Sequence, residues 1–146
     1  MDVEGFKREL FTMARDMQRI LHDTVAPICQ RQGLTLQQMH VLLELVDMPG
    51  QTSSQLSARA GILRANFSSV CRKLEEGGLV ERRRSPHDRR SYELQITDEG
   101  RALLAQIDSE VKRRYGKVFE EEPQETFETV LAGFRALGEF VGKFER

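Results

Sequence analysis

The residues best suited to binding chemistry in this 146-residue sequence are cations and small polar groups near its middle. Between Arg64 and Arg90 there are eight basic and four acidic residues, a local charge of +4 in a chain whose net charge is −1. The rest of the chain is therefore acidic. A basic segment on an acidic chain is the electrostatic footprint expected of a surface that binds a polyanion.

The first part of this segment has the pattern of a helix from about Arg64 to Glu76 that can read DNA. Asn66 can pair with adenine through two hydrogen bonds, and Arg72 can read guanine or hold a phosphate. The outward positions of this helix are Arg64, Ala65, Asn66, Ser68, Ser69 and Arg72. The inward positions are Phe67, Val70, Cys71 and Leu74. An ordinary solvated helix face is the alternative interpretation of the outward residues.

The second part is a predicted β-hairpin, with strands at residues 79–84 and 92–96 and a polar turn between them. Arginines at such a tip can enter a narrow minor groove, where the potential is most negative. Arg82, Arg83 and Arg84 can contact phosphate or brace the hairpin. Asp88 would repel phosphate, so we expect it to be a structural partner of Arg90 or of a nearby basic residue. The candidate DNA-binding residues of the hairpin are Arg84, His87, Asp88, Arg89 and Arg90.

Short helices must position these two segments. Thr35 with Gln38, and Thr52 with Gln55, have the spacing of capping boxes, in which side chains satisfy the free N–H groups of a helix start. The second box predicts a short helix through Ala60, and Gly61 then predicts a turn. Two short helices, a tight turn and a basic hairpin together predict a winged helix-turn-helix.

Longer amphipathic helices flank this unit. A first stripe is formed by Phe6, Leu10, Met13, Met17, Ile20, Leu21, Val25 and Ile28, and Pro27 is expected to kink or end that helix. The helix that begins at Thr35 is expected to bury Leu36, Met39, Leu42, Leu43 and Val46. A helix capped at Thr97 is predicted to run to about Glu122, and Pro123 separates it from the last one. The last stripe is formed by Phe127, Val130, Leu131, Phe134, Leu137, Val141 and Phe144.

These patterns predict a mainly α fold with a small β-hairpin. We expect residues 35–100 to form the winged helix-turn-helix, and residues 1–34 and 101–146 to form a helical dimerisation region. Packing of each terminal helix on its own winged helix is the alternative.

Other classes of function receive little support. The two cysteines and three histidines lack metal-ligand spacing, so neither a metal nor another cofactor is expected. Ser85 and His87 lie near each other without an orienting third group, which argues against an enzyme. No apolar run approaches membrane-spanning length, and no signal peptide is visible. We therefore expect a cytoplasmic protein.

An ordered set of short motifs resembles the MarR family of bacterial regulators. The set comprises residues 26–27, 33–35, 52–56 and 74–80, then Asp88, Arg89 and Arg90, and finally residues 94–100 with Thr97 and Gly100. The wing motif followed by a Leu-x-x-Thr-x-x-Gly segment is the most specific part. One departure is Leu63, where the family often has a Ser or Thr that caps the recognition helix and touches phosphate.

The resemblance implies a homodimer that acts as a repressor on a pseudo-palindromic operator in double-stranded DNA. It assigns Asn66, Ser68, Ser69 and Arg72 to the recognition helix and Arg90 to the wing. It also implies release by a small phenolic or lipophilic effector, for which Met17, His22, Met39 and His40 are the candidate lining, with ordinary core packing as the alternative. Cys71 is expected to be a buried inert thiol and Cys29 to be more exposed. A winged helix used only for protein interaction is the competing interpretation of the whole.

Overall fold

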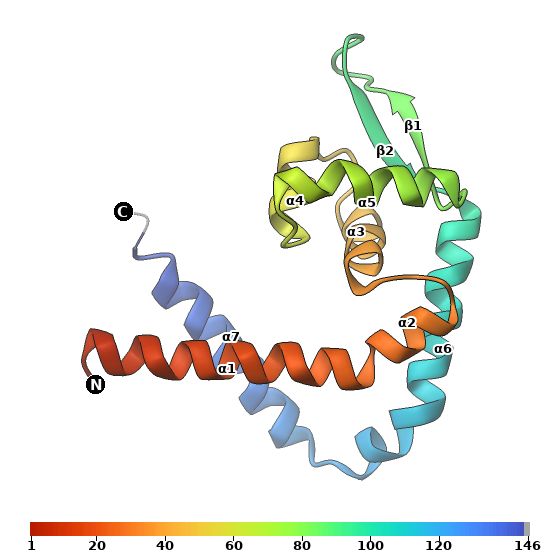
Figure 1. The fold of residues 1–146 in the computed structure, drawn as a ribbon. Coiled ribbons are helices and arrows are strands. Elements are labelled where there is room, and N and C mark those ends of the chain that lie inside the picture. Colours follow the sequence, from red (N-terminus) through yellow and green to blue (C-terminus); the bar gives the residue numbers. More distant parts are fainter. Residues whose placement is uncertain (145–146) are drawn as a thin grey trace. The chain divides into compact units, whose positions relative to one another are not determined.

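Helices make up most of the chain, and one two-stranded antiparallel hairpin interrupts them, as the sequence predicted (Figure 1). The computed structural model describes residues 1–144. The chain divides into two compact units, Met1–Val111 and Lys112–Arg146, which are described separately. The elements are α1 (Val3–Thr24), α2 (Ala26–Arg31), α3 (Leu36–Asp47), α4 (Ser53–Arg59), α5 (Arg64–Glu76), β1 (Val80–Arg84), β2 (Tyr92–Ile96), α6 (Asp98–Glu121) and α7 (Gln124–Val141).

The first apolar stripe belongs to two helices. α1 ends at Thr24, and Pro27 lies in the first turn of α2, which begins at Ala26. Proline has no N–H to donate and is tolerated in a first turn, where that group has no intrahelical partner. The chain thus breaks at Val25, two residues before Pro27, which agrees with the prediction that the helix is kinked or ended near this proline.

Both predicted capping boxes are present. Thr35 accepts a hydrogen bond from the backbone of Gln38, whose side chain accepts one from the backbone of Thr35. Thr52 and Gln55 make the same reciprocal pair at the start of α4. These caps set where α3 and α4 begin, and so fix the two helices that support α5.

The core of the first unit lies among α2, α3, α4, α5 and the base of the hairpin. Its most completely buried side chains are Ile28, Cys29, Val41, Leu42, Leu56 and Leu74. The prediction for α3 was partly wrong, because Leu43 and Val46 are exposed, whereas Val41 and Leu45 are buried. α3 has two apolar stripes about 100° apart, and the helix period alone cannot say which one meets the core.

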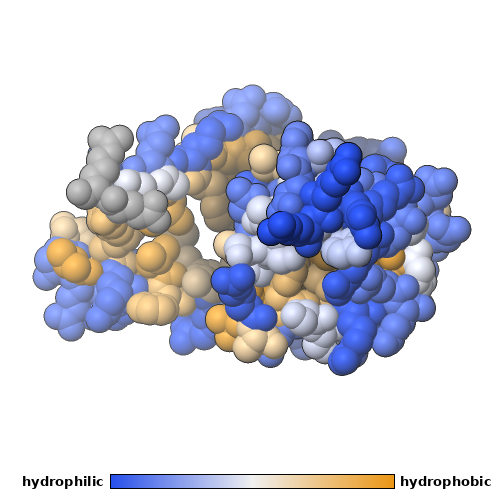
Figure 2. Space-filling model, turned by 90° about the horizontal axis from the view of Figure 1, so that it is seen from above, coloured by the Kyte–Doolittle hydropathy of each residue, from blue (hydrophilic) through white to orange (hydrophobic). Residues whose placement is uncertain are grey.

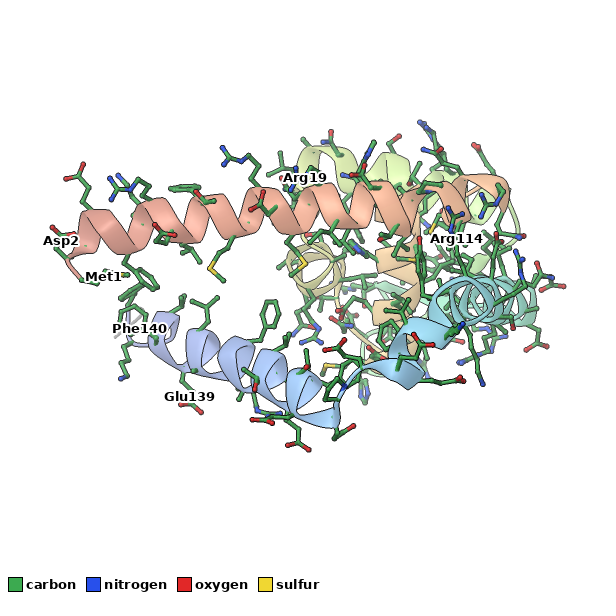
Figure 3. All side chains as sticks on the ribbon, turned by 90° about the horizontal axis from the view of Figure 1, so that it is seen from below. Met1, Asp2, Arg19, Arg114, Glu139 and Phe140 are labelled. Atoms are coloured by element: carbon green, nitrogen blue, oxygen red, sulfur yellow. The ribbon has the colours of Figure 1, made fainter. Side chains whose placement is uncertain are left out.

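The terminal helices have a different character. Neither α1 nor α7 has a buried residue among the residues described, although both have strongly amphipathic sequences. Glu139 and Phe140 project from different sides of α7 (Figure 3). In the second unit, Phe119 stacks on Phe127 with ring centroids 5.4 Å apart, across the bend at Pro123 that the sequence predicted.

Candidate nucleic-acid interface

A tight turn aims α5 away from α4. Gly61 has φ +68°, a left-handed conformation that residues with a Cβ rarely adopt. The next residue, Ile62, is buried, and its N–H donates to the carbonyl of Ser57 at 2.9 Å. The chain is thus anchored immediately before α5 begins, which gives the helix-turn-helix its fixed geometry.

α5 separates its residues into two faces, as predicted. Phe67, Val70, Cys71 and Leu74 are the buried residues of this helix. All six outward residues proposed from the sequence are exposed, namely Arg64, Ala65, Asn66, Ser68, Ser69 and Arg72. The exposed face therefore combines an amide, two hydroxyls and two guanidinium groups on a rigid element.

The start of α5 has no side-chain cap. Leu63 occupies the N-cap position, makes no capping hydrogen bond and is 75% exposed. Its carbonyl accepts hydrogen bonds from the N–H groups of Asn66 and Phe67. The backbone carbonyl of Leu63 therefore begins the hydrogen-bond pattern of α5, whereas its side chain makes no hydrogen bond to the helix.

The hairpin that follows is braced against α5. Val80 pairs with Ile96 at its base, and Arg84 pairs with Tyr92 at its far end. The Arg82 guanidinium donates to the Glu75 carboxylate at 2.8 Å, which joins β1 to α5. Arg83 forms an ion pair with Glu81 on the same strand at 2.5 Å. These two arginines brace the hairpin, one of the two roles considered from the sequence.

The hairpin tip is held by its own short polar side chains. Ser85 is buried, donates to Glu93 at 2.8 Å and accepts from the N–H of His87 at 3.2 Å. The Asp88 carboxylate accepts from the N–H of Arg90 at 2.9 Å. Asp88 is thus a structural partner of Arg90, as expected, through the backbone of Arg90.

The remaining arginines of the hairpin carry charge into solvent. Arg84, Arg89 and Arg90 are exposed, and within residues 1–144 none of them is in an ion pair with a carboxylate. Seen from above, the hairpin is among the most hydrophilic parts of the visible surface (Figure 2). The local positive charge is therefore concentrated at the tip and on the outer face of α5.

Two surface hollows flank α5 and reveal residues that the sequence did not single out. One, of about 240 Å³, is lined by Gln37 of α3 and by Asn66, Ser69 and Lys73 of α5. The other, of about 150 Å³, is lined by Ser68, Arg82 and Tyr92 among others. Lys73 follows Asn66 and Ser69 at helical spacing, which could have identified it. The alternation of Tyr92, Leu94 and Ile96 with Glu93 and Gln95 predicted a half-buried strand with Tyr92 on its apolar face, but Tyr92 is 57% exposed.

The base of the hairpin is fastened to α6. Thr97 donates through its hydroxyl to the carbonyl of Gly78 at 2.7 Å and accepts from the N–H of Gly100 at 3.1 Å. A Cβ on Gly100 would lie 2.3 Å from the carbonyl oxygen of Leu79. Gly100 therefore permits a close approach between α6 and the chain entering β1.

Both thiols are buried, so the expectation of a more exposed Cys29 was wrong. Cys29 lies on the inner side of α2, with its sulfur 3.3 Å from that of Met39. Burial raises the pKa of the Cys29 thiol. Burial likewise raises the pKa of the Cys71 thiol from 9.0 to about 11, opposed by the charge of Arg82. Both thiols are therefore protonated at neutral pH, and Cys71 is buried as expected.

The four candidate effector residues lie in different environments. His22 is exposed beside Asp23, and Met17 is partly exposed, both on α1. Met39 is buried and His40 is half-buried, both on α3. None of the four lines either hollow beside α5.

Two properties of the described chain bear on its class. Within residues 1–144, none of the helices combines the length and apolar character needed to cross a bilayer. The same residues bring no three His, Cys, Asp or Glu side chains together in a group suited to a metal ion.

Comparison with known proteins places this geometry among transcription regulators. The sequence profile of the MarR family matches residues 32–91. The homoprotocatechuate degradative operon repressor of Escherichia coli is 30% identical over 115 residues, which cover 77% of this chain and 78% of the repressor.

Two solved structures extend the likeness. The transcriptional repressor CouR bound to a 23-mer DNA duplex is 31% identical, with a TM-score of 0.71 and coverage of 94% of this chain and 96% of that one. NadR in complex with 4-hydroxyphenylacetate is 25% identical, with a TM-score of 0.72 and coverage of 87% and 89%.

Proposed function

The chain belongs to the MarR family of DNA-binding transcriptional regulators, and from this premise we propose that it represses transcription as a homodimer on a pseudo-palindromic operator. The observation that carries the proposal is the pairing of an exposed polar face on α5 with three arginines free of carboxylates at the hairpin tip. A DNA complex of a relative that is 31% identical supports it.

In the proposed complex, α5 enters the major groove and the hairpin reaches the adjacent minor groove. Asn66, Ser68, Ser69 and Arg72 face base edges and nearby phosphates. Arg90 enters the minor groove, with its backbone held by Asp88. Arg84, His87 and Arg89 contact the DNA backbone, and Arg64 takes the phosphate that a capping hydroxyl would otherwise hold.

The dimer is proposed from the apolar faces that the terminal helices leave exposed. On α1 these include Met13 at 61% and Ile20 at 52% exposure. On α7 they include Leu131 at 55% and Phe134 at 51% exposure. A second copy would cover such faces, with residues 1–34 and 101–146 forming the interface and residues 35–100 reading DNA. Two half-sites about one helical turn apart would then be read together.

The effector is proposed to be a small aromatic acid that binds between α1 and α3 and lowers operator affinity. The candidate residues are Met17 and His22 on α1, which have exposed surface, and His40 and Met39 on α3, which are half-buried and buried respectively. The ligand-bound relative makes 4-hydroxyphenylacetate the first compound to test. Thermal denaturation and operator release should both respond to it, and His40→Ala should weaken both responses.

The primary test is selection of bound DNA from a random pool, followed by affinity measurement on the recovered site. We expect an inverted repeat, an affinity that falls steeply with salt because counterions are released, and a loss of about 1–3 kcal/mol for Arg90→Ala. Arg59→Ala is the matched control and should leave affinity unchanged, because this arginine pairs with Glu44 and belongs neither to the proposed interface nor to the proposed DNA contacts. A flat salt response with no selected sequence would favour a winged helix that binds proteins only.

A further inference from the structure

Leu63 is a large apolar side chain that the fold does not use. The preceding residue, Ile62, is 5% exposed and anchors the turn, whereas Leu63 is 75% exposed. Its backbone carbonyl accepts two hydrogen bonds within α5, but a residue of any type would supply that carbonyl. The isobutyl group therefore lies in solvent at the leading end of a helix whose outward residues are otherwise mostly polar.

This side chain also excludes a more stabilising one. Serine, threonine, aspartate or asparagine at an N-cap accepts a hydrogen bond from a free N–H of the first turn, and such a cap typically contributes about 1 kcal/mol. The structure shows no side-chain cap at Leu63, in contrast to the boxes at Thr35 and Thr52. With leucine at this position, α5 lacks the stabilising hydrogen bond that a polar N-cap residue would supply.

The position and chemistry of the group suggest what it contacts. The N-terminal residues of a recognition helix lie closest to the base edges of the major groove. The apolar group that these edges present is the C5-methyl of thymine, which side-chain hydrocarbon contacts favourably. An isobutyl group can neither donate to a phosphate nor pair with a polar base edge, whereas its neighbours Arg64 and Asn66 can do both.

We propose that Leu63 is a specificity-determining residue that reads the C5-methyl group of a thymine in each half-site. The inference rests on the proposed DNA-binding function and adds one base preference to it. Ala65, also exposed and apolar, lies two residues along the helix and leaves space for the base to approach.

The test is a thymine-to-uracil scan of the selected operator, because uracil differs from thymine only in lacking this methyl group. For the unmodified protein we expect one symmetry-related thymine pair at which uracil weakens binding about fourfold per half-site, the effect of one buried methyl-sized group. Leu63→Ala should bind the thymine operator more weakly and show no uracil penalty at that pair.

Two further variants separate this role from helix stability. Leu63→Ser should restore a cap and stabilise α5, yet it should also lose the uracil penalty. Leu43→Ala, which truncates a partly exposed leucine on α3, should keep the penalty.

The possible outcomes distinguish the two levels of the proposal. Specific binding with the same uracil penalties in the unmodified protein and Leu63→Ala overturns the role of Leu63 and leaves the DNA-binding function standing. Specific binding by the unmodified protein with no uracil penalty at any thymine also overturns the role of Leu63 and leaves the DNA-binding function standing. Absence of sequence-selective binding overturns the proposed function and the role of Leu63 together.

Discussion

In α5, the residues that the helix period turns inward are buried, whereas α1 and α7 contain no buried residue among those described. All three helices have apolar stripes at similar spacing, so the sequence pattern alone makes them look alike. The difference lies in what covers each stripe. The winged helix covers the stripe of α5 with its own core, whereas the stripes of α1 and α7 contain no buried residue. Substitutions placed in matched pairs can test this contrast.

The largest expected loss of stability comes from truncating a buried side chain beneath α5. Leu74→Ala should lower the free energy of unfolding by about 2–5 kcal/mol, because Leu74 is fully buried and its removal leaves a cavity. Urea denaturation followed by circular dichroism at several protein concentrations would measure it.

Leu131→Ala in α7 is the matched control. At concentrations where the chain is monomeric, it should change the free energy of unfolding by no more than about 0.5 kcal/mol. At higher concentrations it should weaken self-association, detected by sedimentation. Equal losses in both variants, independent of concentration, would contradict the contrast.

A second pair compares two glycines. Gly100→Ala should destabilise the protein by about 1–3 kcal/mol, because the new Cβ would lie 2.3 Å from the Leu79 carbonyl and must force the chain apart. Gly133→Ala in α7 meets open space and should instead stabilise the helix by about 0.5–1 kcal/mol. Melting curves of dilute protein measure both. A loss for Gly133→Ala that grows with concentration would place this residue at the interface between copies.

The third pair concerns two N-caps within the winged helix. Thr52→Ala removes the capping box of α4 and should cost about 1 kcal/mol of unfolding free energy. Leu63→Ser adds a cap to α5 and should raise the unfolding free energy by a similar amount. Chemical denaturation would show the opposite signs, and a loss for Leu63→Ser would mean that the isobutyl group supports the fold after all.

The smallest effect at neutral pH concerns the Cys71 thiol under α5. Its pKa in the folded protein is about 11 against an ordinary 9.0, so the folded state holds this proton more tightly than the unfolded state. The corresponding stability is fully present below pH 9 and is lost as the pH rises toward 11. Denaturation curves at pH 8, 9, 10 and 11 should show this decline, and Cys71→Ala should reduce it.

The winged helix could be predicted from the sequence largely because its signals are local. The capping pairs at Thr35 and Thr52 mark helix starts, and Gly61 marks the turn. The bounds of α5 were predicted correctly, since polar and apolar residues there alternate with a single helical period. The second strand was also predicted correctly, because Tyr92, Leu94 and Ile96 alternate with the polar residues Glu93 and Gln95.

What the sequence missed depends on contacts between distant residues. Cys29 is buried because α2 packs against Met39, ten residues along the chain. The choice between the two stripes of α3 depends on where α4 and α5 lie. The pairing of Arg82 with Glu75 depends on a strand passing beside a helix. No local pattern contains that information, so the sequence could not tell which of the five arginines of the hairpin form ion pairs.

The hairpin tip has a consequence for how such a protein can diversify. Its turn is held by Ser85, Asp88, Ser91 and Glu93, so the side chains of Arg89 and Arg90 have no structural duty there. Mutations at these two positions can therefore be sampled without loss of the folded state. Selection can therefore retune the proposed DNA contacts of the tip while the rest of the domain is inherited unchanged, and a protein engineer can exchange the two residues in the same way.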